Sequence, residues 1–138
     1  MSFSPLGLTP LIGVFDMHAS LAFYRDVLGF SVVNASPAVE TREGRFSHWM
    51  WLRFGEAEIM LNTIYDSNER PPEPPERRSG DTVFYIHCAD IDLAYKELTG
   101  RGLKSKPPQM ARYGLRLFSV KDPDGYIVVF QEIASSER

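Results

Sequence analysis

Two side chains of this sequence could move protons, and both lie in patterns typical of β-strands. Glu58 lies in the run AEIMLN at residues 57–62, and His87 lies in the run TVFYIHC at residues 82–88. Carboxylates and imidazoles are the groups that most often act as general acids and bases. Glu58 and His87 are therefore candidates for an acid–base pair. The structural alternatives are a rim carboxylate in contact with water and a hydrogen-bonded histidine in a cavity wall.

A third strand pattern, at residues 46–54, brings two tryptophans and an arginine to one face. Trp49, Trp51 and Arg53 alternate with residues that are all apolar, which is the period of a strand with one buried face. Tryptophan offers a flat, rigid contact surface with a polar N–H, and arginine can pair with an acidic group of a ligand. This face therefore predicts a surface for planar molecules. Core or interface filling by the tryptophans, and a solvated strand end at the arginine, stay open as alternatives.

Composition and charge argue against several other kinds of function. The formal net charge is −3, without the basic excess of nucleic-acid-binding proteins, and no apolar run approaches the roughly 20 residues of a membrane span. The chain has no nucleophile elbow, P-loop, dinucleotide fingerprint or Cys-x-x-Cys motif. Cys88 is the only cysteine and cannot form an intramolecular disulfide. Because the N-terminus also lacks the features of a secretory signal, we expect a cytoplasmic protein that contacts neither nucleic acid nor membrane.

Residues 8–65 have the pattern of one strand, one helix and three further strands. Asp16 follows the first apolar run and is a good N-cap, and Gly29 can end the helix in the left-handed conformation. A tight turn at Gly55-Glu56 is expected to join the last two strands. The three strands after the helix are expected at Phe30–Asn34, Phe46–Phe54 and Ala57–Asn62.

Residues 81–133 repeat this order of elements. A strand precedes Asp90, which is the expected N-cap of a second helix that ends at Gly100 or Gly102. Two strands follow, at Leu115–Val120 and Tyr126–Glu132, joined by a turn that contains proline and glycine. A strand–helix–strand–strand–strand unit used twice is the simplest account.

The segment at residues 66–80 separates these two halves. It holds four prolines and many charged residues and has no apolar periodicity, which is typical of an exposed linker. We therefore expect residues 1–138 to form a single domain of two modules, 8–65 and 81–133.

Three motifs resemble those of the vicinal-oxygen-chelate superfamily, which contains glyoxalases, bleomycin-resistance proteins and extradiol dioxygenases. They are Val14-x-Asp16 with the following SLAFYRDVLGF, the segment Asp81–Gly102, and DPDGY at residues 122–126 followed by IVVF. The resemblance implies an α+β fold in which paired βαβββ modules form a curved mixed sheet around a cavity. It also implies a homodimer.

Enzymatic members of that superfamily hold a metal at four strand positions. The resemblance places these positions at Thr9, Met60, Val83 and Val129. A threonine hydroxyl is a poor ligand, and the other three side chains offer no nitrogen or oxygen donor. We therefore expect no metal and no other cofactor. A displaced site built from Glu58, His87 and Gln131 stays open as an alternative.

Strand alternation divides the side chains between a helix-packed face that is apolar and a cavity face that is mixed, as a ligand-binding face should be. The other two histidines, His18 and His48, are expected outside the cavity. The residues expected to bind a ligand are Trp49, Trp51, Arg53, Met60, Asn62, Tyr85, His87, Tyr113, Leu117, Ser119 and Gln131.

These patterns predict a dimeric protein that binds a small, partly aromatic or apolar molecule without metal. The resemblance to the bleomycin-resistance branch suggests that it sequesters a toxic compound. The first alternative is a lyase, isomerase or dioxygenase of the same superfamily that uses a displaced metal or the pair Glu58 and His87. The second is a non-catalytic interaction module whose cavity is filled by its own side chains. The sequence leaves open whether residues 66–80 cover the pocket as a lid and whether a dimer exchanges its modules.

Overall fold

Both main helices begin at the aspartates that the sequence predicts as caps. The structure is a computed structural model that describes residues 2–65, 67–77 and 79–133. The Asp16 carboxylate accepts a hydrogen bond from Ala19 N at 3.1 Å, and the Asp90 carboxylate accepts one from Leu93 N at 3.0 Å. Each bond satisfies one of the backbone donors that a helix leaves free in its first turn. The two main helices are α1 (Met17–Leu21), which continues as the π-helix η1 (Ala22–Leu28), and α2 (Ile91–Gly100), and η2 (Ser79–Asp81) is a short 3-10 helix.

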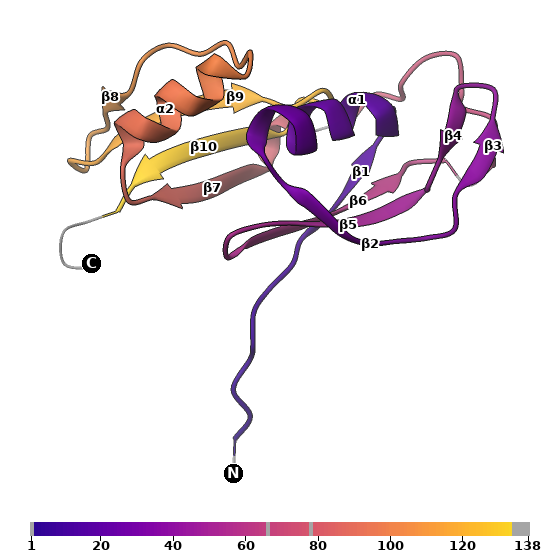
Figure 1. The fold of residues 1–138 in the computed structure, drawn as a ribbon, viewed down its shortest axis with the longest axis horizontal. Helices are drawn as coiled ribbons and strands as arrows, with labels where there is room; N and C mark the ends of the chain where they lie inside the picture. Colours follow the sequence, from indigo (N-terminus) through magenta and orange to yellow (C-terminus); the bar gives the residue numbers. More distant parts are fainter. Residues whose placement is uncertain (1, 66, 78, 134–138) are drawn as a thin grey trace.

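Two four-stranded sheets with equivalent strand orders lie beneath these helices (Figure 1). The first sheet has the order β1-β6-β5-β2 and consists of β1 (Leu11–Val14), β2 (Ser31–Ala35), β5 (Trp49–Phe54) and β6 (Ala57–Thr63). The second has the order β7-β10-β9-β8 and consists of β7 (Val83–Cys88), β8 (Gln109–Met110), β9 (Arg116–Lys121) and β10 (Ile127–Glu132). β1 pairs in parallel with β6, and β7 pairs in parallel with β10. The other neighbouring strands in the two sheets are antiparallel. The predicted α+β fold of two βαβββ modules is thereby confirmed.

The chain between β2 and β5 forms an additional hairpin that was not predicted. It pairs β3 (Val39–Thr41) with β4 (Gly44–Phe46). The expectation of one continuous strand over residues 46–54 is wrong at its start, because Phe46 ends β4 and residues 47 and 48 lie outside the strands. Ser47 Oγ there donates a hydrogen bond to Ser36 O at 2.7 Å. The sheet strand β5 therefore begins only at Trp49.

The first helix changes its winding after one turn. Tyr24 O accepts hydrogen bonds from Gly29 N at 3.1 Å and from Phe30 N at 2.9 Å, and Gly29 ends the helix with φ 104°, in the predicted left-handed conformation. The Tyr24 side chain is only 1% exposed, and its hydroxyl donates to Asp122 Oδ2 at 2.7 Å. The π-helix thus carries a polar group that reaches the second module.

One face of each sheet is buried beneath its helix, and the opposite face is open. Leu52 and Leu61 of the first sheet are fully buried, as are Val128 and Phe130 of the second. On the open face, Tyr85 is 49% exposed. The alternation along the strands therefore separates core side chains from the surface on which the candidate site lies.

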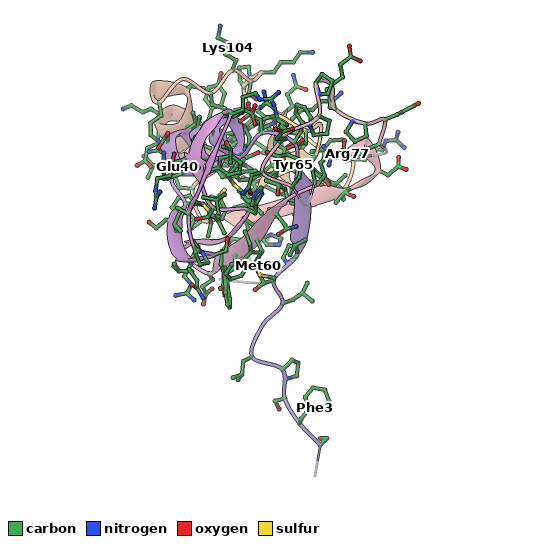
Figure 2. All side chains as sticks on the ribbon, turned by 90° about the vertical axis from the view of Figure 1, so that its right-hand side faces the viewer. Phe3, Glu40, Met60, Tyr65, Arg77 and Lys104 are labelled. Atoms are coloured by element: carbon green, nitrogen blue, oxygen red, sulfur yellow. The ribbon has the colours of Figure 1, made fainter. Side chains whose placement is uncertain are left out.

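Residues 2–10 form an extended segment, here called the N-terminal arm, that leaves the body of the fold at β1 (Figure 1). Phe3, Leu6 and Leu8 are 88, 104 and 89% exposed, and Figure 2 shows Phe3 well away from the other labelled residues. The arm joins the first sheet at Pro10, whose carbonyl oxygen accepts a hydrogen bond from Met60 N at 2.8 Å. Among the described helices, none is long and apolar enough to cross a membrane.

The Asp124 carboxylate joins three distant segments of the chain. Its Oδ1 accepts hydrogen bonds from Phe15 N at 2.9 Å and from Arg77 Nη2 at 2.6 Å. Arg77 Nη1 donates to Gly13 O at 2.8 Å. The Asp124 side chain is 4% exposed, so this charge is paired where little water reaches it. The segment that the sequence predicts as a linker is therefore tied to both modules.

The neighbouring Asp122 completes this junction from the turn between β9 and β10. Its Oδ1 accepts hydrogen bonds from Asp124 N at 2.8 Å and from Tyr126 N at 2.9 Å, while Oδ2 faces Tyr24. Burial raises the pKa of Asp122, although the three hydrogen bonds act in the opposite direction. Gly125 closes the turn with φ 90°, and a Cβ there would lie 2.9 Å from Ser79 Oγ, so only glycine fits.

We expect Arg77→Met to destabilise the fold strongly. Methionine keeps most of the length of the side chain but removes the cation, which leaves the Asp124 carboxylate buried without its ion pair. Breaking a buried ion pair in this way costs about 3–5 kcal/mol of unfolding free energy. Urea unfolding followed by circular dichroism measures the change.

The matched control is Arg42→Met. Arg42 pairs with Glu69 at 2.9 Å, but the two side chains are 70 and 72% exposed. Exposed ion pairs contribute at most about 1 kcal/mol. Equal losses of stability in the two variants would contradict the central place of the Arg77–Asp124 pair.

Candidate functional site

The open face of the first sheet carries the two tryptophans. The β5–β6 register places Trp49 opposite Asn62, Trp51 opposite Met60, and Arg53 opposite Glu58. Side chains opposite each other on antiparallel strands are close enough to interact. The structure thus brings together five of the residues predicted to bind a ligand and Glu58, the candidate acid–base residue.

Glu58 fixes the position of the Trp51 ring. Glu58 Oε1 accepts a hydrogen bond from Trp51 Nε1 at 2.8 Å and a second from Arg53 Nη2 at 3.3 Å. The Glu58 side chain is 26% exposed and the Arg53 side chain 52% exposed. The indole N–H is satisfied by a neighbour on the adjacent strand, so the flat face of the ring stays available for contact.

The open face of the second sheet is more polar. His87 and Gln131 are register partners on β7 and β10, and the Tyr113 hydroxyl donates a hydrogen bond to Gln131 Oε1. Loss of solvent around its hydroxyl, and then a hydrogen bond with Tyr85, raise the pKa of Tyr113. Gln131 is only 8% exposed. The loop that carries Tyr113 therefore reaches over this sheet face.

The other two predicted residues of this face belong to β9. Leu117 is the register partner of Gln131, and Ser119 is the register partner of Val129. Both Leu117 and Ser119 also line a separate hollow of about 360 Å³ at the β8 edge of the sheet. β8 and β7 are the two edges of this sheet, and β7 is the edge that faces the first module. The hollow therefore lies at the edge away from the first module.

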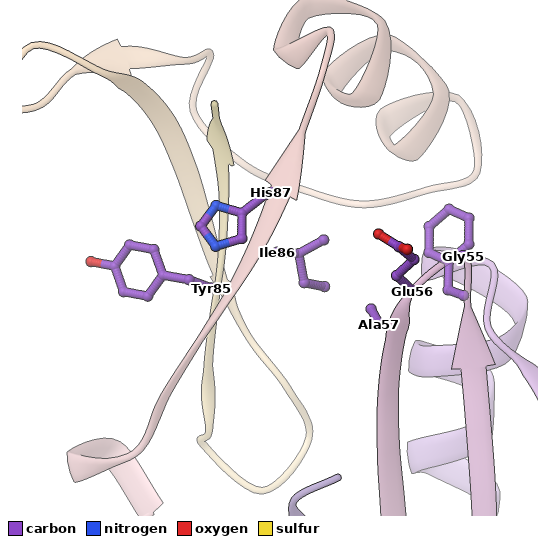
Figure 3. Close-up of a pocket in the computed structure, with 7 residues that line it drawn as sticks. Gly55, Glu56, Ala57, Tyr85, Ile86 and His87 are labelled. Carbon is purple, nitrogen blue, oxygen red and sulfur yellow. The ribbon is translucent and has the colours of Figure 1, made fainter. Parts of the chain in front are cut away.

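A groove runs between the two modules, where β7 faces the β5–β6 turn. A pocket of about 420 Å³ is lined by Glu56 and His87, and a second pocket of about 300 Å³ is lined by Leu8 and Glu58. Glu56, Ala57, Tyr85 and Ile86 line both pockets. Figure 3 shows Ile86 pointing from β7 toward Ala57 and Glu56, whereas Tyr85 points to the other side of the strand.

Sequence reasoning missed the groove residues Glu56, Ala57 and Ile86. Glu56 and Ala57 were assigned only to a turn and a strand end, and Ile86 was assigned only to a strand. The groove depends on how the two modules sit side by side, and no local pattern in the sequence carries that information.

Glu58 and His87, the candidate acid–base pair, do not contact each other in this structure. Glu58 lines the smaller pocket and His87 the larger one, and no hydrogen bond connects them among the described residues. Glu58 is instead engaged by Trp51 and Arg53. The arrangement suits a binding surface better than proton transfer between these two groups.

The four positions expected to hold a metal do not suit one. Val83, Met60 and Val129 have no nitrogen or oxygen in their side chains, and Thr9 offers one neutral hydroxyl. Val83 is 42% exposed and Val129 is 5% exposed, so these positions give the face apolar character. In residues 2–65, 67–77 and 79–133 there is no group of three or more His, Cys, Asp and Glu side chains that could hold a metal ion.

Cys88 and the remaining histidines lie away from this face. Cys88 is half-buried, and burial raises the pKa of its thiol, which keeps it in the unreactive protonated form. His48 Nδ1 is hydrogen-bonded to Thr63 Oγ1 at 2.6 Å, and His48 Nε2 to Asn68 Oδ1 at 2.9 Å. His18 is exposed and packs against Phe46, with ring centroids 5.4 Å apart.

Several solved structures have the same fold as this chain. TioX from Micromonospora sp. ML1 superposes with a TM-score of 0.69 at 18% identity, covering 91% of this chain and 96% of that one. A bleomycin-binding protein complexed with bleomycin gives 0.67 at 18% identity, with coverage of 93 and 98%. TnmS3, an antibiotic-binding protein from Streptomyces sp. CB03234, gives 0.66 at 21% identity, with coverage of 97 and 99%.

The sequence itself places the chain in a family. The model of the Glyoxalase/Bleomycin resistance protein/Dioxygenase superfamily matches residues 8–130. The chain belongs to this superfamily, as its motifs suggested. No curated protein matches it.

Proposed function

We propose that this chain, a single domain of two βαβββ modules, binds a small, partly aromatic or apolar molecule without a metal ion. The ligand would lie on the open sheet face and in the groove between the modules. Sequestration of a toxic compound would be its role, and no covalent step is involved. The proposal includes a cytoplasmic location, which the single cysteine supports.

The observation that carries this proposal is the hydrogen bond between Trp51 Nε1 and Glu58 Oε1. It holds the indole in one orientation before any ligand arrives, and a preorganised contact surface avoids part of the entropy lost on binding. Trp49 lies on the same face of the same strand, and Met60 is the register partner of Trp51. Flat aromatic rings beside a flexible thioether suit planar apolar ligands.

Two of the structural neighbours support a binding role over an enzymatic one. One is described as bleomycin-binding and another as antibiotic-binding. The four expected metal positions of this chain carry side chains unsuited to metal, and Glu58 and His87 form no pair. The enzymatic alternatives therefore have no geometry to favour them in the described residues.

We also propose that the protein is a homodimer. The open face leaves Leu11 and Val83 exposed by 52 and 42%, and the three apolar side chains of the N-terminal arm are almost fully exposed. Contiguous exposed apolar surface marks interaction sites in proteins. A second copy would cover part of the open sheets and give the arm an apolar partner.

Intrinsic fluorescence tests the binding proposal, because both tryptophans of the chain lie on the open face. We expect planar aromatic compounds to quench the emission to saturation. Loss of one aromatic stacking contact removes about 1 kcal/mol, so Trp51→Leu should raise the dissociation constant about fivefold. Trp49 emission remains as the signal in that variant.

The control for this titration is Tyr95→Phe. Tyr95 packs against Phe118 between α2 and the sheet, away from the open face. The substitution should therefore leave binding unchanged. Failure of every compound in the panel to quench, or equal affinity in wild type and Trp51→Leu, would count against the proposed site.

Size-exclusion chromatography with light scattering tests the dimer. We expect twice the mass of one chain for the wild type and a concentration-dependent shift toward the monomer when residues 2–8 are deleted. Leu93→Ser changes a residue on α2 that is 50% exposed and lies away from the open face, so it should leave the mass unchanged. A monomeric wild type at all concentrations would rule out the dimer.

A further inference from the structure

The first module has a second pocket on the opposite side of its sheet from the tryptophans. A cavity of about 390 Å³ lies between the first helix, the β3–β4 hairpin and the start of β5. Met50, which lines it, alternates along β5 with Trp49 and Trp51 and therefore points to the other face of the sheet. The sheet thus separates this pocket from the proposed ligand face.

The base of this second pocket is apolar. Leu21 and Phe46 are 6 and 5% exposed, and Met50 packs against the same core. The volume falls within the range of small-molecule sites, which are mostly apolar with a few placed polar groups. An apolar base of this kind suits the hydrocarbon or aromatic part of a ligand.

The rim of the pocket is basic. His18 comes from α1 and Arg25 from η1, and Arg45 comes from β4 across the opening. His18 is held against the wall by its edge contact with Phe46. No carboxylate lines the pocket among the described residues.

The two arginines form only weak, exposed ion pairs with other residues. Arg25 pairs with its neighbour Asp26 at 2.8 Å, and Arg45 Nη1 pairs with Glu40 at 2.7 Å. All four side chains are between 48 and 73% exposed, so these pairs contribute little and can be exchanged. Nη2 of Arg45 and Nη1 of Arg25 make no hydrogen bond to another described residue, and a guanidinium offers five N–H donors.

We infer that this pocket is a second binding site, which takes a small organic anion: a carboxylate, sulfonate or phosphate attached to an apolar body. Arg25 and Arg45 bind the anionic group, because the planar guanidinium matches the geometry of oxyanions. His18 adds a ring nitrogen at the rim. Leu21, Phe46 and Met50 contact the apolar body.

The π-helix supports this assignment. Seven consecutive residues of π-winding are rare, and such segments occur often at functional sites. Arg25 lies within the π-helical segment, whereas α2, its counterpart in the second module, is a regular α-helix. The two modules share a fold, but this pocket depends on elements that belong to the first module alone: the π-helix and the β3–β4 hairpin.

The test uses anilinonaphthalene sulfonate, an aromatic sulfonate whose fluorescence rises in apolar sites, and its neutral analogue phenylnaphthylamine. We expect the double variant Arg25→Gln/Arg45→Gln to weaken sulfonate binding by at least about tenfold, because two charge-assisted contacts are lost. The neutral analogue should change by less than about twofold in the same variant.

A control pair removes the same charge elsewhere. Arg42→Gln/Arg112→Gln alters two exposed arginines that do not line this pocket, and it should leave the affinity for the sulfonate unchanged. Ala38→Phe fills the pocket from its exposed rim and should weaken both probes while leaving all charges in place. Near-ultraviolet circular dichroism verifies that each variant is folded.

Amide chemical shifts locate the probe. Binding in this pocket perturbs Leu21, Ser47 and the β3–β4 hairpin, whereas binding to the open face perturbs β6, β7 and β10. Unchanged affinity in the arginine double variant, an equal loss in the control pair, or shifts that spare Leu21, Ser47 and the hairpin would overturn the second site. None of these results bears on whether planar ligands quench the tryptophans.

Discussion

The Asp124 carboxylate is the point at which the two modules and the segment between them meet. It is buried, it accepts hydrogen bonds from Phe15 N and Arg77, and Arg77 in turn donates to Gly13. A buried carboxylate is tolerated only when it is paired, so the surrounding chain must keep these donors in place. The Tyr24–Asp122 bond beside it ties the first helix to the same turn. The relative position of the two sheets, and therefore the shape of the groove between them, depends on this polar junction.

Both candidate sites follow from the way each strand divides its side chains. On β5, one set of residues forms the core and the base of the second pocket, and the alternate set carries the tryptophans. On the open face, Glu58 accepts hydrogen bonds from Trp51 and Arg53 and so fixes the positions of these two side chains. In the second module, the Tyr113 hydroxyl fixes the Gln131 side chain in a similar way, by donating a hydrogen bond to it. The two open faces differ in polarity, so a ligand that spans both would have an aromatic part and a hydrogen-bonding part.

Local signals in the sequence predicted the regular elements well. Asp16 and Asp90 cap their helices and Gly29 ends the first one, because these residues act through the backbone next to them. The alternation along β5, β6, β7 and β10 assigned the two sheet faces. The hairpin β3–β4 was missed because its strands have only three residues each, too few to show an alternating pattern. The role of Arg77 and the groove were not predicted, since each depends on contacts between residues far apart in the chain. The π-winding was not predicted either, because no residue pattern in that segment distinguishes it from an α-helix.

The central claim is that the open face of these sheets is a binding surface that works without a metal ion. Elemental mass spectrometry, on protein purified without chelators or metal-affinity resin, tests this most directly. The account predicts that each transition metal is present at far below one ion per chain. Zinc, iron, manganese or nickel at close to one ion per chain would contradict it and would direct attention to a displaced site around Glu58 or His87.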